Sequence, residues 1–433
     1  MSALPLVDRP DGATLFASRS GTITVAAFLA DVHALAARLP GDGAVVNLCR
    51  DRYAFTVAFA AALVRGRTSL LCGDASLLPQ IAPDHPGCIA VTDDQAVSAP
   101  MPLLFADPTG QGRGGPNPLI PANQLAAIVF TSGSTGLPTG HPKNWGALVA
   151  RSRAAAERFN VEHAAIVGTV PPGHMYGFEV TVLLPLHAAC SSWCGPAFFP
   201  GDVQAALAAS AAPRILVTTP LHLRALLQDM RPPPLHAIIS ATAPLDPALA
   251  ADAEASWSAP VLEIFGATEC GSIASRRTIE GDDWTLYPGL SLAADPAGFS
   301  AAAEGMPPVP LADEFDVLDG GRFRLLGRRA DMVKLGGRRA SLLGLNRILT
   351  GLDGVVDGLF VVPDDLDRSS TARLHAVVVA PTRSATSILA ELRDRMDPLF
   401  LPRRVIHVDA LPRNEVGKLP RQAVLDLLAR APR

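Results

Sequence analysis

Hydrophobic and polar residues alternate with two different periods in the first part of the chain. Apolar residues recur at helical spacing over 25–39 and 53–66, and short continuous apolar runs occupy 44–49 and 68–72. Short apolar runs bounded by turn residues are typical of buried strands, so these segments predict alternating helices and strands. This alternation indicates an α/β protein, in which helices cover the faces of a parallel sheet.

The same pattern continues through the middle of the chain. Strand-like runs at 125–130, 214–220, 237–240 and 261–265 each end in small or polar residues before a helix or loop. Ligands of open α/β sheets bind outside the carboxyl ends of such strands. We therefore expect functional residues directly after these runs.

The pattern changes towards the C-terminus. Short strands around a Gly-rich turn follow at 313–327, and a smaller unit with mixed helices and strands begins after Asp331. A chain of 433 residues is also long enough for two domains. We predict a large N-terminal domain of βα-layered sheets over residues 1–327. A small, mobile C-terminal α+β domain is predicted over 328–433, with its hinge near Asp331.

Composition excludes several classes of protein. A hydrophobic content of 48% with 18% charged residues is typical of a globular chain, and a net charge of −4 with scattered arginines argues against a nucleic-acid-binding surface. The longest apolar runs are too short to span a bilayer, and the first residues lack the features of a signal peptide. Six cysteines without paired spacing are expected to be reduced and buried. We expect a cytoplasmic protein with no nucleic-acid partner and no membrane span.

Lysine is rare in this chain. Only three of the 37 basic residues are lysine: Lys143, Lys334 and Lys418. Because arginine serves elsewhere, a remaining lysine is expected where a compact, rotatable point charge contacts phosphate or carboxylate. All three lie in segments that also carry glycine, which favours a phosphate-handling enzyme.

A Gly/Ser/Thr-rich loop, TSGSTG at 131–136, follows the apolar run 125–130. Small residues let backbone N–H groups converge on a polyphosphate, and hydroxyl groups donate to its oxygens. The Walker pattern is absent, and a loop of this composition taken alone is as often an exposed turn. His141 and Lys143, which follow it, favour phosphate binding.

A second candidate segment is Phe-Gly-Ala-Thr-Glu at 265–269, again directly after an apolar run. Gly266 permits close backbone approach, the hydroxyl of Thr268 can reach a phosphate, and Glu269 can hold Mg²⁺ against one. By itself the segment is equally compatible with a helix cap.

Taken together and in order, the motifs resemble those of the adenylate-forming superfamily. They are TSGSTGxP, FGxTE, an aspartate, GRxxDxxK with a following GxR, and PxxxxGKxxR, spread over about residues 125–425. The superfamily contains acyl- and aryl-CoA synthetases, adenylation domains of peptide synthetases, and luciferases. The form TSGSTGxPxxHxKxW and the segment VPPGHMYGFE at 170–179 are also similar to compact bacterial ligases of aryl-polyene and xanthomonadin-type pigment pathways.

The resemblance implies a nucleotide site. The residues that would bind ATP are Thr131, Ser132, Gly133, Ser134, Thr135 and Gly136 with Lys143 at the β- and γ-phosphates, Phe265 with Gly266 at adenine, and Asp313 with Arg328 at the ribose. Thr268 would contact the α-phosphate, and Glu269 would hold Mg²⁺. The chain departs from the family pattern in three places. Thr139 replaces the usual lysine, Phe265 replaces the commoner tyrosine, and Gly344 and Asn346 stand where relatives often carry acids.

The resemblance also implies two half-reactions. Lys418 would reach the substrate carboxylate and the α-phosphate during adenylation, and Lys334 would belong to the face presented during thiol transfer. His174 matches one wall of the family's acyl pocket. A lone histidine is more often structural, but its place there favours a gate between the carboxylate and the incoming thiol.

The sequence thus predicts an ATP- and Mg²⁺-dependent acid–thiol ligase. It would convert an aryl or acyl carboxylic acid into an acyl-AMP and transfer the acyl group to a pantetheine thiol of an acyl carrier protein or CoA. Two alternatives stay open: an adenylate-forming enzyme with an amine or O₂ as acceptor, and a non-catalytic nucleotide-binding scaffold. The presence of Lys418, Glu269 and Asp313 argues against the scaffold.

Overall fold

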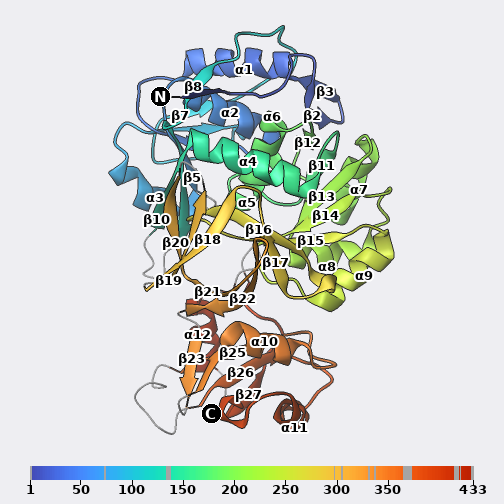
Figure 1. Ribbon diagram of the computed structural model, residues 1–433. Helices are drawn as coiled ribbons and strands as arrows, with labels where there is room; N and C mark the ends of the chain where they lie inside the picture. Colours follow the sequence, from blue (N-terminus) through green and yellow to red (C-terminus); the bar gives the residue numbers. More distant parts are fainter. Residues whose placement is uncertain are drawn as a thin grey trace. The chain divides into compact units, whose positions relative to one another are not determined.

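Two compact units make up the chain (Figure 1). The computed structural model describes residues 2–72, 75–132, 138–296, 298–303, 306–329, 332–335, 338–363, 373–413, 419 and 421–430. The first unit comprises Met1–Gly281, Thr285–Ser291 and Ala302–Val309, and the second comprises Asp282–Trp284, Leu292–Ala301 and Pro310–Arg433. The predicted boundary after residue 327 and the hinge stay predictions, since Asp331 lies outside the described residues.

One sheet of the first unit runs in the order β10-β9-β5-β4-β6-β7. Its neighbouring strands are parallel except for β9 and β10, which are antiparallel. The strands are β4 (Val45–Asn47), β5 (Ser69–Cys72), β6 (Ile89–Thr92), β7 (Leu103–Phe105), β9 (Leu125–Ser132) and β10 (Pro138–Asn144). Those predicted at 44–49, 68–72 and 125–130 are confirmed.

A second sheet places its strands in the order β16-β15-β14-β13-β11-β12-β2-β3 within the first unit. The six inner strands are parallel, while β16 and β3 are antiparallel to their neighbours. Bounds are β2 (Thr14–Ser18), β3 (Gly21–Thr24), β11 (Ala165–Gly168), β12 (Ser191–Trp193), β13 (Arg214–Thr218), β14 (Ala237–Ser240), β15 (Val261–Ala267) and β16 (Gly271–Arg277). The predicted parallel α/β architecture is therefore confirmed for this unit.

Helices flank these sheets. The longer ones are α1 (Val25–Arg38), α2 (Arg52–Val64), α4 (Trp145–Phe159), α7 (Pro200–Ala209), α8 (Pro220–Asp229) and α9 (Pro247–Trp257). The shorter helical segments are η1 (Ala75–Leu77), α3 (Leu78–Ile81), η2 (Ala82–Asp84), α5 (Met175–Gly177), the π-helical η3 (Phe178–Leu183), α6 (Leu184–His187) and η4 (Thr278–Glu280). In the part of the chain that the structure describes, no helix is long and apolar enough to cross a membrane.

Helix α2 lies at the centre of the main core of the first unit. Every residue from Arg52 to Leu63 is buried, which fits a helix that is apolar on all sides. Its aromatic side chains meet those of neighbouring elements, with the rings of Phe59 and Phe178 5.0 Å apart and nearly perpendicular. The core therefore joins α2 to η3, the segment that follows His174.

Arg52 is a charged residue in this apolar helix. Its guanidinium donates to the backbone oxygens of Gly195 and Val170, both at 2.9 Å, and to that of Gly168. These bonds compensate part of the cost of burying the charge, although Nε has no partner among the described residues. Burial lowers the pKa of Arg52 to about 10, which still leaves it protonated at neutral pH. The residue ties the carboxyl end of β11 to α2, and so fixes the start of the loop that leads to His174.

The second unit contains a sheet in the order β25-β26-β27. Its elements are β21 (Asp313–Leu318), β22 (Arg322–Arg328), β23 (Met332–Leu335), β24 (Arg338–Ser341), α10 (Leu342–Thr350), β25 (Asp357–Val361), β26 (His375–Val379), α11 (Ala385–Arg395), η6 (Pro398–Phe400), β27 (Arg404–His407) and α12 (Arg421–Arg430). The remaining strands are β1 (Ala3–Pro5), β8 (Leu119–Pro121), β17 (Asp283–Leu286), β18 (Leu290–Asp295), β19 (Gly298–Ala303) and β20 (Met306–Leu311). The predicted small α+β unit is thus present in the second unit.

A buried histidine in the first unit makes stability depend on pH. His187 is 7% exposed and packs against Trp145 with ring centroids 5.1 Å apart. Burial lowers its pKa from 6.5 to about 3, and the nearby Arg153 acts in the same direction. The unfolded chain therefore takes up this proton at a higher pH than the folded chain, and the folded state loses stability as the pH falls from 6.5 towards 3.

We expect His187→Phe to reduce the pH dependence of the free energy of unfolding by about 1.4 kcal/mol for each pH unit below the ordinary histidine pKa. Denaturant unfolding at several pH values between neutrality and pH 4 measures the slope. His236→Gln provides the matched control, since His236 is exposed. An acid slope that is the same in His187→Phe and wild type would contradict the assignment.

Candidate active site

The segment predicted to contact the α-phosphate and Mg²⁺ forms a turn between two strands. Strand β15 ends at Ala267, residues 268–270 form the turn, and β16 begins at Gly271. The turn exposes Glu269 and leaves Phe265 and Thr268 half-buried. Because the chain returns directly as an antiparallel strand, the alternative that this segment caps a helix is wrong.

Two glycines allow the strands to approach closely at this turn. The register of β15 and β16 shifts between Phe265 and Gly266. A Cβ atom on Gly266 would lie 2.5 Å from the backbone oxygen of Gly271, and Gly271 itself has a φ of +74°. A side chain at either position would force the turn apart, so the local backbone depends on both glycines.

Lys143 reaches this turn from the neighbouring sheet. It lies on β10, where side chains alternate between faces, so Lys143 and His141 share one face. Nζ of Lys143 donates to the backbone oxygen of Glu269 at 2.6 Å, and the side chain is 7% exposed. Burial lowers the pKa of the Lys143 ammonium, while the nearby Glu179 acts to raise it. Its predicted phosphate contact stays a prediction, and the structure gives its ammonium a partner on the turn.

His141 contacts Thr131, the first residue of the predicted phosphate loop. Its Nε2 is 3.2 Å from Oγ1 of Thr131, at the end of β9. Burial lowers the pKa of His141, partly opposed by Glu269, so the ring is neutral at pH 7. The rest of the predicted loop is not placed: Gly133, Ser134, Thr135, Gly136 and the side chain of Ser132 lie outside the described residues.

Two charged residues beneath the turn were missed at the level of sequence. Glu179 on η3 accepts from the backbone N–H of Ser272, 3.1 Å from each carboxylate oxygen, and from the hydroxyl of the same serine. Nη2 of Arg151 on α4 donates to the backbone oxygen of Cys270 at 3.3 Å. Glu179 and Arg151 are 5% and 8% exposed. In the sequence, the one feature that could have pointed to Glu179 is that it is a single carboxylate within the apolar run 178–186.

The segment that carries His174 lies beside the same turn. Cε of Met175 would contact a Cβ atom on Gly271 at 3.4 Å. His174 is half-buried, and its role as a gate stays a prediction. The next aromatic residue belongs to the core, because the hydroxyl of Tyr176 donates to the backbone oxygens of Thr218 and Ile239 at 3.1 and 2.9 Å.

A further polar cluster follows the carboxyl ends of β11 and β13. Oγ1 of Thr169 is 3.0 Å from Oγ1 of Thr218 and 2.9 Å from Nδ1 of His222. Burial lowers the pKa of His222. The edge of the sheet was predicted to carry functional residues, but these three were not named individually.

The other predicted residues belong to the second unit. Asp313 is 7% exposed and lies directly opposite Arg328 in the β21–β22 pair. Lys334 belongs to β23, but its side chain lies outside the described residues, as does all of Lys418. The contribution of these four residues to a nucleotide site stays a prediction.

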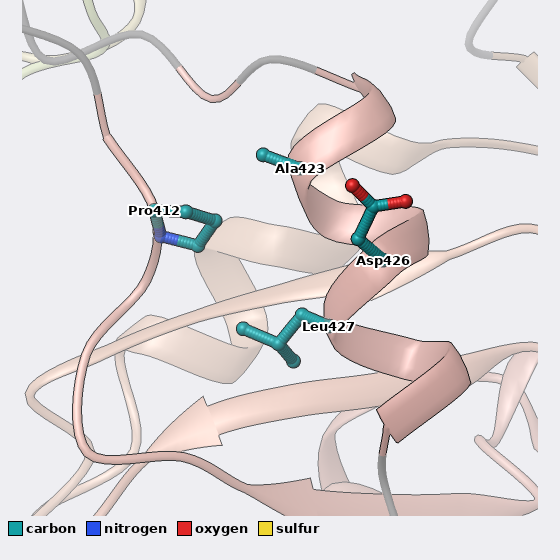
Figure 2. A pocket seen from close by; sticks show the side chains of 4 residues that line it. All are labelled: Pro412, Ala423, Asp426 and Leu427. Carbon is teal, nitrogen blue, oxygen red and sulfur yellow. The ribbon is translucent and has the colours of Figure 1, made fainter.

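A pocket of about 300 Å³ lies within the second unit. Figure 2 shows its lining by Pro412 on one side and by Ala423, Asp426 and Leu427 of α12 on the other. None of these residues carries the chemistry predicted for the nucleotide, so the candidate site remains at the turn between β15 and β16.

The turn fits a magnesium–nucleotide complex. Among the described residues, no group of three His, Cys, Asp or Glu side chains is arranged to hold a metal ion by itself. Mg²⁺ instead suits one or two protein carboxylates combined with phosphate oxygens, and the exposed Glu269 can supply one. The half-buried Thr268 adds a hydroxyl donor next to it.

Comparison with known proteins identifies the family. A 4-coumarate–CoA ligase from Rhodobacter capsulatus is 32% identical over 314 residues, which are 69% of this chain and 76% of that protein. An L-proline–[L-prolyl-carrier protein] ligase from Pseudomonas fluorescens is 24% identical over 360 residues, 71% of this chain and 70% of that protein. ATP-bound MatB from Rhodopseudomonas palustris matches with a TM-score of 0.81 at 21% identity, over 98% of both chains.

The structural match confirms the predicted fold class, and the sequence matches confirm the resemblance to adenylate-forming enzymes. The finer likeness to ligases of pigment pathways stays a prediction. The family model for AMP-binding enzymes matches residues 43–297, more than half of the chain. The chain therefore belongs to the AMP-binding enzyme family.

Proposed function

We propose that the protein is an acid–thiol ligase that uses ATP and Mg²⁺. It converts an aryl carboxylic acid into an acyl-adenylate and then transfers the acyl group to a pantetheine thiol. The observation that carries this proposal is the turn at 268–270, where Glu269 is exposed while Lys143 holds its backbone oxygen at 2.6 Å. Family membership and the sequence likeness to a 4-coumarate–CoA ligase support the reaction class.

In the first half-reaction, an oxygen of the substrate carboxylate attacks the α-phosphorus of ATP. The bond from that phosphorus to the bridging oxygen breaks, and pyrophosphate leaves. Thr268 donates to the α-phosphate, and Glu269 holds Mg²⁺, which neutralises phosphate charge when it is bound. Lys418 supplies a further positive charge between the two anions that must meet.

In the second half-reaction, the thiol sulfur attacks the acyl carbonyl carbon. The bond from that carbon to the adenylate oxygen breaks, the thiol loses its proton, and AMP leaves. We assign His174 to the entry of the thiol and Lys334 to the face that receives the pantetheine arm. CoA and acyl carrier proteins present the same pantetheine thiol, and the relatives named above include ligases for each.

Carboxylate-dependent ATP–pyrophosphate exchange tests the proposal. The panel contains hydroxycinnamic, hydroxybenzoic and short fatty acids, and the control lacks any acid. We expect exchange with the aromatic acids. Product analysis with CoA and with a phosphopantetheinylated carrier protein then identifies the acceptor. If folded protein that binds ATP shows no exchange with any of the acids, the proposal is contradicted.

His174 provides a test of the second half-reaction. We expect His174→Ala to slow thioester formation about 10-fold or more while pyrophosphate exchange changes little, because a gate acts after the adenylate has formed. The two rates are measured on the same preparation, by exchange and by thioester formation from supplied acyl-adenylate. Equal losses in both rates would exclude a gate.

A further inference from the structure

Three charged side chains bind backbone groups at the turn between β15 and β16 and at the start of β16. Lys143 donates to the oxygen of Glu269, Arg151 donates to the oxygen of Cys270, and Glu179 accepts from the N–H of Ser272. The three side chains come from β10, α4 and η3, which are separate elements of the first unit. The turn is therefore fixed from three directions.

These contacts matter energetically because the three side chains are buried. Lys143, Arg151 and Glu179 are each more than nine-tenths buried, and charges removed from water are costly unless they are paired and hydrogen-bonded. Two cations and one carboxylate gather here. Glu179 offsets part of the desolvation cost of both cations and is favoured by them in turn, whereas Lys143 and Arg151 repel each other. Elsewhere in this unit the buried side chains are mostly apolar, with charged exceptions such as Arg52, Glu263 and Arg276. Three buried charges that bind one turn indicate that the conformation of this turn matters for function.

The backbone at the turn is closely packed against Glu179. A Cβ atom on Gly271 would collide with a carboxylate oxygen of Glu179, so the carboxylate lies directly against the turn. Glu179 itself lies on the π-helical η3, and π-helical turns are rare and frequently found at functional sites. Movement of any of the three charged groups would be transmitted to residues 268–272.

We propose that Lys143, Arg151 and Glu179 form a positioning clamp that orients Thr268 and Glu269 towards the α-phosphate and Mg²⁺. This inference rests on the proposed function and deepens it. The clamp residues touch the turn, and their effect on the reaction passes through its backbone. In this arrangement Lys143 acts on the carbonyl of the magnesium-binding residue, and its influence on phosphate is indirect.

Lys143→Met provides the main test, because methionine replaces the side chain up to Cε and removes the terminal ammonium with its charge and donors. We expect kcat for ATP–pyrophosphate exchange to fall about 10- to 100-fold, the scale of a small misplacement of catalytic groups. The Mg²⁺ concentration for half-maximal rate rises several-fold, and KM for the acid is unchanged. Arg153→Met is the matched control on the same helix as Arg151, since Arg153 pairs with Asp8 and both side chains are half-exposed.

A second variant keeps the test valid if Lys143→Met fails to fold. Ser272→Ala removes the hydroxyl that donates to Glu179 but keeps the backbone N–H. We expect a smaller loss of kcat with a shift of the Mg²⁺ dependence in the same direction. The double variant Lys143→Met with Ser272→Ala should lose little more than Lys143→Met alone, because groups that act as a unit are not additive.

Thermal melting of each variant separates positioning from stability. Variants that are folded at the assay temperature and show unchanged kcat and Mg²⁺ dependence would overturn the clamp. Loss of activity in proportion to unfolded protein, with the Mg²⁺ dependence of wild type, would also overturn it. Failure of the proposed function is distinguishable, since wild type itself would then show no exchange.

Discussion

Lys418→Met is expected to lower the rate of ATP–pyrophosphate exchange by about 100- to 1,000-fold. The substrate carboxylate and the α-phosphate are both anionic, and a preorganised charge placed where negative charge accumulates contributes on this scale. The assignment of Lys418 rests on the motif PxxxxGKxxR, since the residue lies outside the described part of the chain. Exchange is measured at saturating ATP and acid.

The second half-reaction serves as the internal control for this variant. Thioester formation from supplied acyl-adenylate is expected to stay within about threefold of wild type, because Lys418 acts only while the two anions meet. Loss of both half-reactions in a folded Lys418→Met protein would show that the role assigned to this lysine is wrong.

Glu269→Gln is expected to lower exchange by about 100-fold, with a higher Mg²⁺ requirement. Glutamine keeps the size of the side chain but removes the negative charge that Mg²⁺ prefers in a ligand. The turn should stay intact, because Lys143 contacts the backbone oxygen of Glu269 and not its carboxylate. Exchange measured across a series of Mg²⁺ concentrations gives both effects.

Glu280→Gln is the matched control for Glu269→Gln. Glu280 is an exposed carboxylate that pairs with Arg277 on the surface, and such pairs contribute little. Its variant should keep the activity and Mg²⁺ dependence of wild type. A Glu269→Gln enzyme with the same Mg²⁺ dependence as wild type would show that Mg²⁺ is held elsewhere.

Local pattern was sufficient to predict β4, β5, β9, β13, β14 and β15 of the two large sheets. Apolar runs such as 125–130 and the wholly buried α2 carry strong signals, because their neighbours in space are also apolar. Strand β10 was missed, since Pro138, Gly140 and Pro142 are poor strand formers. Its place at the edge of the sheet explains how it forms, because proline is tolerated on edge strands. Other strands, such as β6, β11 and β16, were also not predicted.

Part of the site could also be predicted from the sequence. Thr268 and Glu269 form a recognisable short motif, and both lie on one turn in the structure. The clamp could not be predicted, since Arg151 and Glu179 meet their partners 119 and 93 residues away along the chain. A buried charge gives no periodic signal, and its partner is set by tertiary packing.

The helix-cap alternative failed for a local reason. A strand followed by Gly-Ala-Thr-Glu is equally compatible with a helix start, because threonine and acidic residues favour the first turn of a helix. Gly266 lies at the register shift between β15 and β16, and Gly271 has a positive φ, so the chain turns back as a strand. Two glycines thus select the hairpin.

Adenylate formation requires that a carboxylate oxygen of the acid attack the α-phosphorus of ATP. The most direct measurement uses an ¹⁸O-labelled carboxylic acid chosen by the exchange assay, with thiol acceptor present and mass analysis of the nucleotide product. We expect AMP that carries ¹⁸O from the acid, and pyrophosphate without label. Label in pyrophosphate or inorganic phosphate, with unlabelled nucleotide, would contradict adenylate formation.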